Sequence, residues 1–282
     1  MPLLYNRRGR EMNVILHRLY RAMLRVVPNC VTQSQAVAFN MFLASFPMVL
    51  VVLGGAASSL ALEQAFQGMV VRLRPLLPPG TVAIFNELLL MHSTHPRRWL
   101  AFGLGGTLLA GTQMMKLMME GFRMVHGDLR PQGFFSRHLR ALLLLSATIL
   151  PSLLTVNLIV FGKQLRGRML HLSSVPVLIR FIWSTLYIAT ALLVAMLVVA
   201  FIYRVGRPGR QSWSSVMPGA AIATLLWWIV SGALGSYLRL VPYSVVYGGL
   251  AVAIGLMLWM QLTATILLIG AAYNAELQQS SA

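Results

Sequence analysis

Six long stretches of uncharged, mostly apolar residues constrain what this chain can fold into more than any other feature of its sequence. They cover residues 33–62, 99–115, 141–162, 181–203, 211–238 and 240–275. A helix needs about 20 mostly apolar residues to cross a bilayer. Only 10% of the residues are charged, against roughly 25% in a soluble domain. The sequence therefore predicts an all-α, polytopic integral membrane protein.

The last stretch is the longest, with 36 residues, but two crossings and a turn would need more than ~40. Pro242 and residues 243–247 predict a short loop that leads into a single helix. We therefore expect a six-transmembrane-helix bundle over residues 34–276. The expected spans are about 34–62, 99–119, 139–162, 177–203, 214–238 and 247–275, followed by a short cytoplasmic tail at 277–282.

Residues 1–33 form a basic segment, and its arginines interrupt the stretch where the apolar core of a signal peptide would lie. Leu16, Leu19 and Tyr20 fall at helical spacing, and Arg18 and Arg21 lie on another face. This pattern predicts an N-terminal amphipathic helix on the cytoplasmic surface of the membrane, with its arginines toward lipid phosphates. A solvated helix packed on the bundle fits the pattern equally well.

The formal net charge is +17. In a soluble protein this excess would suggest nucleic acid, but in a membrane protein basic loops lie against anionic lipid head groups and set the orientation. We expect lipid, and not nucleic acid, as the partner. With the N-terminus inside, 14 Lys and Arg residues fall on the cytoplasmic side and 9 on the other. This bias predicts that both termini are cytoplasmic.

Several features predict how the helices pack. Small residues four positions apart indicate helix–helix contacts; the pairs are Ala101/Gly105, Gly106/Ala110, Gly219/Ala223, Ser231/Gly235 and Ala251/Gly255. Pro47 and Pro151 lie inside their spans and should kink them, whereas Pro218 lies near the start of its span, where proline fits without strain. The connection 63–98 either caps the bundle or acts as a lid over a cavity.

No charged residue lies at the middle of a predicted span, so a relay of buried carboxylates is not expected. Lys116 and Glu120 are predicted to form an interfacial pair, four residues apart on one helix. Asn40, Asn157 and Gln261 are candidates for lining a cavity. Most of the other polar residues in the spans should form interhelical hydrogen bonds.

The sequence offers no catalytic, cofactor or metal site. Its six acidic residues are scattered singly, whereas metal and acid–base sites need clustered groups. His92 and His95 are close enough to share a metal, but Pro96 follows at once and no third ligand is evident. The single cysteine, Cys30, excludes an internal disulfide. We expect a protein that is not an enzyme.

Two stretches of the chain resemble the YihY/virulence factor BrkB family. The first is Ala36-Val37-Ala38-Phe39 followed by Ser45-Phe46-Pro47. The second contains Met217-Pro218-Gly219-Ala220, Trp227, Tyr237, Tyr243, Tyr247-Gly248, Trp259, Gly270-Ala271 and Asn274-Ala275. The resemblance covers residues 30–276 and implies a six-span bacterial inner-membrane protein, labelled in the family as a virulence factor or transporter and, mistakenly, as a ribonuclease.

Two positions depart from the family pattern. Asn40 stands where the family has tyrosine, and Ala272 stands where it usually has glutamate. A family mechanism that relies on that carboxylate would need Glu276, one turn later, in its place.

The sequence leaves two principal functional hypotheses. The first is a transporter or permease-like module for an amphiphilic or anionic envelope compound, because basic residues flank an uncharged but polar-lined bundle. The alternative is a non-transporting scaffold in envelope assembly or serum resistance, with small-residue faces that bind a second copy or another envelope protein. A membrane-bound nuclease is disfavoured, since no set of acids could activate water.

Overall fold

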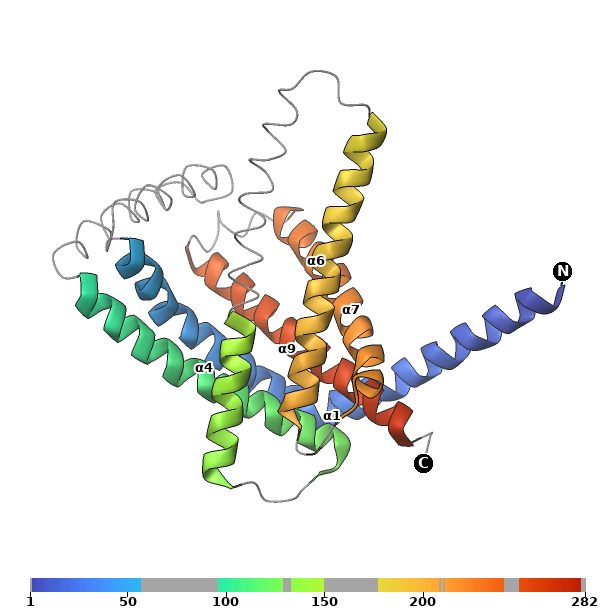
Figure 1. Ribbon diagram of the computed structural model, residues 1–282, viewed down its shortest axis with the longest axis horizontal. Helices are drawn as coiled ribbons and strands as arrows, with labels where there is room; N and C mark the ends of the chain where they lie inside the picture. The colour runs from blue at the N-terminus through green and yellow to red at the C-terminus, as the bar shows by residue number, and fades with distance from the viewer. Residues whose placement is uncertain are drawn as a thin grey trace. The chain divides into compact units, whose positions relative to one another are not determined.

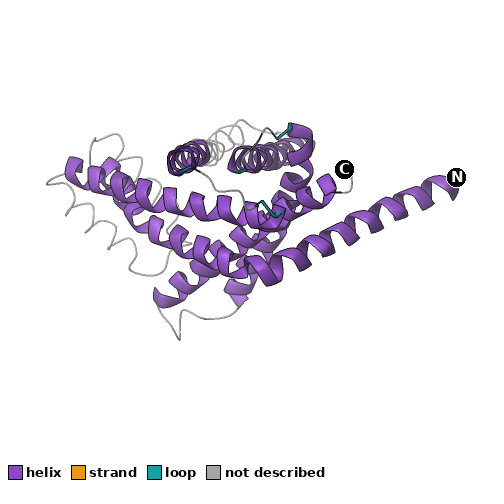
Figure 2. Ribbon diagram, turned by 90° about the horizontal axis from the view of Figure 1, so that it is seen from below, coloured by secondary structure: helices purple, strands orange, loops and turns teal. Residues whose placement is uncertain are grey.

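The computed structural model describes residues 2–56, 96–128, 133–149, 177–207, 209, 211–240 and 249–279. Helix is the only regular secondary structure within these ranges (Figure 2). The prediction of an all-α protein is confirmed for this part of the chain. The expected lid or cap at 63–98 lies almost entirely outside the described residues. The predicted kink at Pro151 lies wholly outside them.

The helices are α1 (Pro2–Ala56), α4 (Pro96–His126), α6 (Val177–Gly206), α7 (Trp213–Leu240) and α9 (Gly249–Gln279). A further helical segment covers residues 134–149. At 1.5 Å per residue, even α7 with its 28 residues is about 42 Å long, enough to cross a hydrocarbon core of about 30 Å. The predicted spans at 177–203, 214–238 and 247–275 match α6, α7 and α9 to within a few residues, whereas the predicted start at 34 lies inside α1.

Four of the described helices are both long enough and apolar enough to cross a membrane. The qualifying stretches are Cys30–Gly55, Ala189–Gly206, Trp213–Tyr237 and Ala253–Gln279. The predicted span at 99–119 lies within α4, which is not among these four, and the predicted span at 139–162 is described only to residue 149. The protein is therefore a membrane protein, and a count of six spans stays a prediction.

The N-terminal segment does not end at residue 33. Helix α1 continues through this position and through both Pro28 and Pro47 as one helix of 55 residues. Proline removes one backbone donor but can be tolerated inside a membrane helix where neighbouring groups compensate. A separate amphipathic surface helix before residue 34 is not resolved as an element of its own.

The described residues fall into two compact units, residues 1–39 with 114–282 and residues 40–113. In the second unit, α1 and α4 approach closely where Pro47 faces glycines of α4. A Cβ added to Gly106 would lie 2.7 Å from Cβ of Pro47, and one added to Gly103 would lie 2.7 Å from the backbone nitrogen of Val51. Glycine is required at both positions because the backbones leave no room for a side chain.

In the first unit, α7 lies beside both α6 and α9 (Figure 1). Two tryptophans join α7 to α9 through their indole N–H groups. Trp227 donates to Thr263 Oγ1 at 3.2 Å, and Trp259 donates to Ser231 Oγ at 3.1 Å. The prediction that polar residues in the spans form interhelical hydrogen bonds is confirmed for Ser231 and Thr263.

The pattern of burial is that of a protein in lipid. Large apolar side chains such as Leu250, Ile229 and Trp228 are more than half exposed. Polar side chains such as Asn274 and Ser34, by contrast, are almost fully buried, and both are hydrogen-bonded. In a bilayer, apolar side chains are well solvated by lipid, while polar groups must find partners inside the protein.

Candidate functional site

The closest approach in the first unit lies where α7 crosses α9. A Cβ added to Gly219 would overlap the carbonyl oxygen of Gly270 and the side chain of Asn274. A Cβ added to Gly270 would meet the carbonyl oxygen of Gly219 at 2.6 Å and Cβ of Ala223 at 2.8 Å. The two helices therefore meet backbone to backbone, and the predicted contact at Gly219/Ala223 is confirmed.

Asn274 binds the backbone of α7 at this crossing with both ends of its amide. Its Oδ1 accepts from the N–H of Gly219 at 2.7 Å, and its Nδ2 donates to the carbonyl oxygen of Val216 at 3.1 Å. The residue is only 2% exposed. A buried amide is stable only when it is hydrogen-bonded, and both halves of this amide are.

Pro218 lies deeper in its helix than the sequence suggested. Helix α7 begins at Trp213, and the hydroxyl of Ser212 accepts from the N–H of Ser215 at 3.3 Å as an N-cap does. Pro218 is consequently beyond the first turn, where a proline ring disturbs the helical hydrogen bonds. The expectation of an unstrained position is wrong, and the N–H of the next residue, Gly219, donates to the side chain of Asn274.

Tyr203 connects α6 to the same crossing. Its hydroxyl donates to the carbonyl oxygen of Leu267 at 2.7 Å, and its ring meets Phe122 of α4 edge to face, with ring centroids 5.3 Å apart. Tyr203 and Phe122 are both buried. Three helices, α6, α7 and α9, thus meet at one small polar junction, which consists of Tyr203, Val216, Gly219, Gly270 and Asn274.

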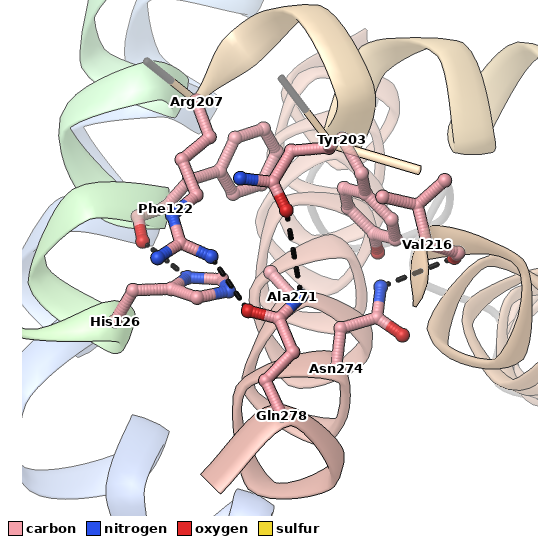
Figure 3. Close-up of a pocket in the computed structure, with 9 residues that line it drawn as sticks. Phe122, His126, Tyr203, Arg207, Val216, Ala271, Asn274 and Gln278 are labelled. Atoms are coloured by element: carbon pink, nitrogen blue, oxygen red, sulfur yellow. Dashed lines mark hydrogen bonds between the residues drawn. The ribbon is translucent and has the colours of Figure 1, made fainter. Parts of the chain in front are cut away.

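A pocket opens beside this polar junction, where α4, α6 and α9 end and α7 begins (Figure 3). Its lining residues are Phe122, His126, Tyr203, Arg207, Gln211, Val216, Ala271, Asn274 and Gln278. Its volume of about 10 Å³ is close to the room that one water molecule needs. The lining of the pocket combines apolar side chains such as Phe122 and Val216 with the cation Arg207 and the amides of Gln211, Asn274 and Gln278.

Arg207 supplies the charge in this pocket. Its guanidinium group points toward Gln278 (Figure 3), with Nη1 donating to Oε1 of Gln278 at 2.8 Å. Its Nε is buried and has no hydrogen-bond partner among the described residues. Burial lowers the pKa of Arg207, while the carboxylate of Asp128 acts in the opposite direction. A guanidinium group stays protonated under such opposing influences.

The residues of the family-like motifs have several different roles. Gly219, Gly270 and Asn274 belong to the polar junction, and Pro218 directly precedes Gly219 on α7. Ala38 is buried, Phe39, Phe46 and Tyr237 are about half exposed, and the hydroxyl of Ser45 donates to the carbonyl oxygen of Phe42 at 2.6 Å. Tyr247 and Gly248 lie outside the described residues.

The three candidates for a cavity lining do not belong to this pocket. Asn40 and Gln261 are half-buried on α1 and α9 and are absent from its lining, and Asn157 lies outside the described residues. Ala272 is fully buried, and Glu276 is partly exposed on the last turns of α9.

The sequence did not predict Tyr203, Arg207 and Gln278 as site residues. Only the basic residues at the end of α6 gave a signal, and that signal concerned Arg207.

Lys116 and Glu120 lie one turn apart on α4, but each of them pairs with the helical segment 134–149 and not with the other, contrary to the prediction. Glu120 accepts from Arg137 at 2.6 Å, and Nζ of Lys116 lies 2.6 Å from Nε2 of His138. An ammonium group can only donate, so Nε2 of His138 accepts, and its Nδ1–H donates to the carbonyl oxygen of Phe134 at 3.1 Å. The two residues fasten 134–149 to α4.

Comparison with known proteins supports the class that these features indicate. Residues 28–282 match the family described as virulence factor BrkB. The chain therefore belongs to the BrkB family of membrane proteins, and the resemblance seen in its motifs is confirmed.

One relative from Bacillus subtilis (strain 168) is described as the ribonuclease-like protein YfkH. It is 25% identical over 181 residues, which are 64% of this chain and 66% of that protein, slightly under two thirds of its length. No solved structure matches the chain significantly.

Proposed function

We propose that this protein is a permease-like module of the bacterial plasma membrane that moves an anionic amphiphilic compound of the cell envelope. The observation that carries the proposal is the polar junction between α6, α7 and α9, which is buried in an otherwise apolar bundle and adjoins a pocket containing a cationic residue. Buried polar groups beside a proline in a membrane helix are typical of sites where a transport pathway opens.

The proposed topology has six spans and both termini in the cytoplasm. In this topology α4, α6 and α9 end on the cytoplasmic side, and α7 begins there. The pocket would then face the cytoplasm. The helix ends beside it carry Arg123, Arg204 and Arg207, in keeping with the preference of basic residues for the inner side.

Single-cysteine labelling tests the transport proposal. Replacing the buried Cys30 with serine gives a background without cysteine, and Gln211→Cys then places one thiol at a partly exposed position of the pocket lining. We expect a membrane-impermeant maleimide to label this thiol from the cytoplasmic face. We further expect an anionic amphiphile to change the labelling rate. One fixed rate under every candidate compound argues against transport.

We also propose that the chain is not an enzyme, although its relative carries a ribonuclease-like name. The support is its small and dispersed set of acids, of which Glu120 is bound to Arg137. Metal-assisted or acid–base cleavage of a phosphodiester needs several such groups directed at one point. Purified protein should leave RNA intact in the presence of Mg²⁺ or Mn²⁺, and cleavage that copurifies with the folded protein would refute this proposal.

A second candidate function, a scaffold for envelope assembly, is favoured by one observation on α7. A Cβ added to Gly232 or Gly235 would meet no atom of the described residues within 4 Å. A helix face with small residues and open space allows another membrane helix to approach closely. The partner would be a second copy of the chain or another envelope protein.

The substitution Gly235→Leu separates the two functions. Because the position is open, we expect the fold of the monomer to tolerate leucine, with a change in its unfolding temperature close to zero. A scaffold would lose its complex in mild detergent, as measured by light scattering after size exclusion. A complex that persists in full with leucine at this position argues against the scaffold.

A further inference from the structure

The pocket contains one buried hydrogen-bond donor, Nε of Arg207, that has no acceptor among the described residues. Each of its three side-chain amide oxygens already accepts a hydrogen bond: Asn274 from Gly219, Gln278 from Arg207, and Gln211 from Gln278 at 3.5 Å. An unpaired buried donor is costly, so an acceptor from outside the chain is needed at this place.

The charge of the site favours an anionic acceptor. Arg207 is a permanent cation, and the neighbouring helix ends carry two further cations, Arg123 and Arg204, and two carboxylates, Asp128 and Glu276. His126 also faces the pocket and uses its Nδ1 on the carbonyl oxygen of Phe122 at 2.8 Å, which makes that nitrogen a donor. The first turn of α7 adds the positive end of a helix dipole.

The size of the pocket restricts what can enter. At about 10 Å³ it admits one atom the size of a water oxygen. A tetrahedral oxyanion would place one oxygen inside, on Arg207, and would leave its remaining oxygens at the mouth, near the amides of Gln211 and Gln278. A guanidinium group suits such an oxygen because its N–H donors lie in one plane and can be shared between neighbouring oxygens.

We propose that the pocket formed by Arg207, His126, Gln211 and Gln278 binds one phosphate group through a single inserted oxygen. The phosphate belongs either to the head group of an anionic lipid or to a free phosphate ion, because the two share this chemistry. The phosphate site assigns a substrate class to the proposed function. Its role in transport rests on that proposed function, whereas phosphate binding itself does not.

A matched pair of arginine variants tests the site. Arg207→Gln removes the guanidinium group from the pocket. Arg204→Gln removes the same charge from the same helix end, but Arg204 lies over the ring of Trp213, 4.5 Å from its centroid, and is absent from the pocket lining. A non-specific effect of positive charge on anions would change equally in both variants.

The measurement is the shift in unfolding temperature of the purified full-length protein with each probe. Protein in phosphatidylcholine nanodiscs receives inorganic phosphate, with chloride at equal ionic strength as the control, and a second preparation contains phosphatidylglycerol in the nanodisc. We expect stabilisation of the wild type and of Arg204→Gln, and binding at least about tenfold weaker in Arg207→Gln. Stabilisation by phosphate alone identifies the free ion, and stabilisation only by phosphatidylglycerol identifies the lipid.

Two results would overturn the site: no stabilisation of the wild type by either probe, which leaves water as the occupant, or equal responses of the two glutamine variants. If Arg207→Gln does not fold, Arg207→Lys keeps the charge without Nε, and an undiminished response of this variant overturns the proposal. If the protein binds phosphate but moves no lipid, transport is refuted and the phosphate site stands. If it moves lipid but binds no phosphate, the phosphate site is refuted and transport stands.

Discussion

Gly219→Val should destabilise the protein more than any other single substitution that we consider. Valine at this position drives its Cβ into the carbonyl oxygen of Gly270 and into the amide of Asn274. Neither is the mobile end of a flexible side chain: one is helix backbone, and the other is held by two hydrogen bonds. We expect a loss of about 3 kcal/mol, or about 10 °C in the unfolding temperature measured in detergent.

Gly232→Val is the matched control for this prediction. It changes the same residue type on the same helix, α7, and a Cβ added there meets no atom of the described residues within 4 Å. The helix propensities of the two variants are equal, so the difference between them isolates the clash. Two variants with the same unfolding temperature would show that α7 and α9 do not meet at Gly219.

Asn274→Leu should give the second largest effect. Leucine has a similar volume but removes the two buried hydrogen bonds that the amide of Asn274 makes to the backbone of α7, at the N–H of Gly219 and the carbonyl oxygen of Val216. At about 1 kcal/mol for each hydrogen bond, the loss is about 2 kcal/mol. We expect unfolding at a temperature lower by about 6 °C, together with a looser α7, as judged by hydrogen exchange of residues 216–223.

Gln261→Leu is the control, because it removes an amide of similar kind from the same helix α9. The side chain of Gln261 makes no hydrogen bond within the described part of the chain, so its loss leaves no donor or acceptor unpaired. We expect its unfolding temperature to stay within about 2 °C of the wild type. Equal losses in both variants would mean that Asn274 acts only through its volume.

The helices themselves were predictable, because apolar runs of bilayer length specify spans directly. Their ends were less so. The predicted start of the fifth span at 214 was close to the observed Trp213, yet Pro218 was interpreted as an N-terminal proline. The error arose because the chemistry of proline depends on its position within the first turns, and sequence alone fixes that position only to within a few residues.

The spacing of small residues predicted some helix contacts and not others. Gly219 and Gly106 lie where another helix presses against them, whereas Gly105 and Gly235 have open space among the described residues. Four-residue spacing places two residues on one face, but it does not say whether that face meets a helix, a partner or lipid. Only the tertiary structure separates these cases.

The residues of the polar junction could not be predicted to meet from the sequence. Asn274 belonged to a recognisable motif, but its partners are 55 and 58 residues away. Tyr203 and Arg207 drew no attention as site residues, because a tyrosine and an arginine at the end of a span are ordinary interfacial residues. Their convergence is a product of helix packing, and no local pattern encodes it.

The flux of an anionic lipid through the reconstituted protein shows whether the protein transports its proposed substrate. Protein reconstituted in phosphatidylcholine liposomes with fluorescent phosphatidylglycerol is treated with dithionite, which bleaches only the outer leaflet. We predict that bleaching extends to lipid from the inner leaflet with the wild type and with Arg204→Gln. With Arg207→Gln, we expect the rate at which the inner-leaflet lipid is bleached to fall by about tenfold. Bleaching that stops at the outer leaflet, as in liposomes without protein, would contradict transport if the incorporated protein is folded.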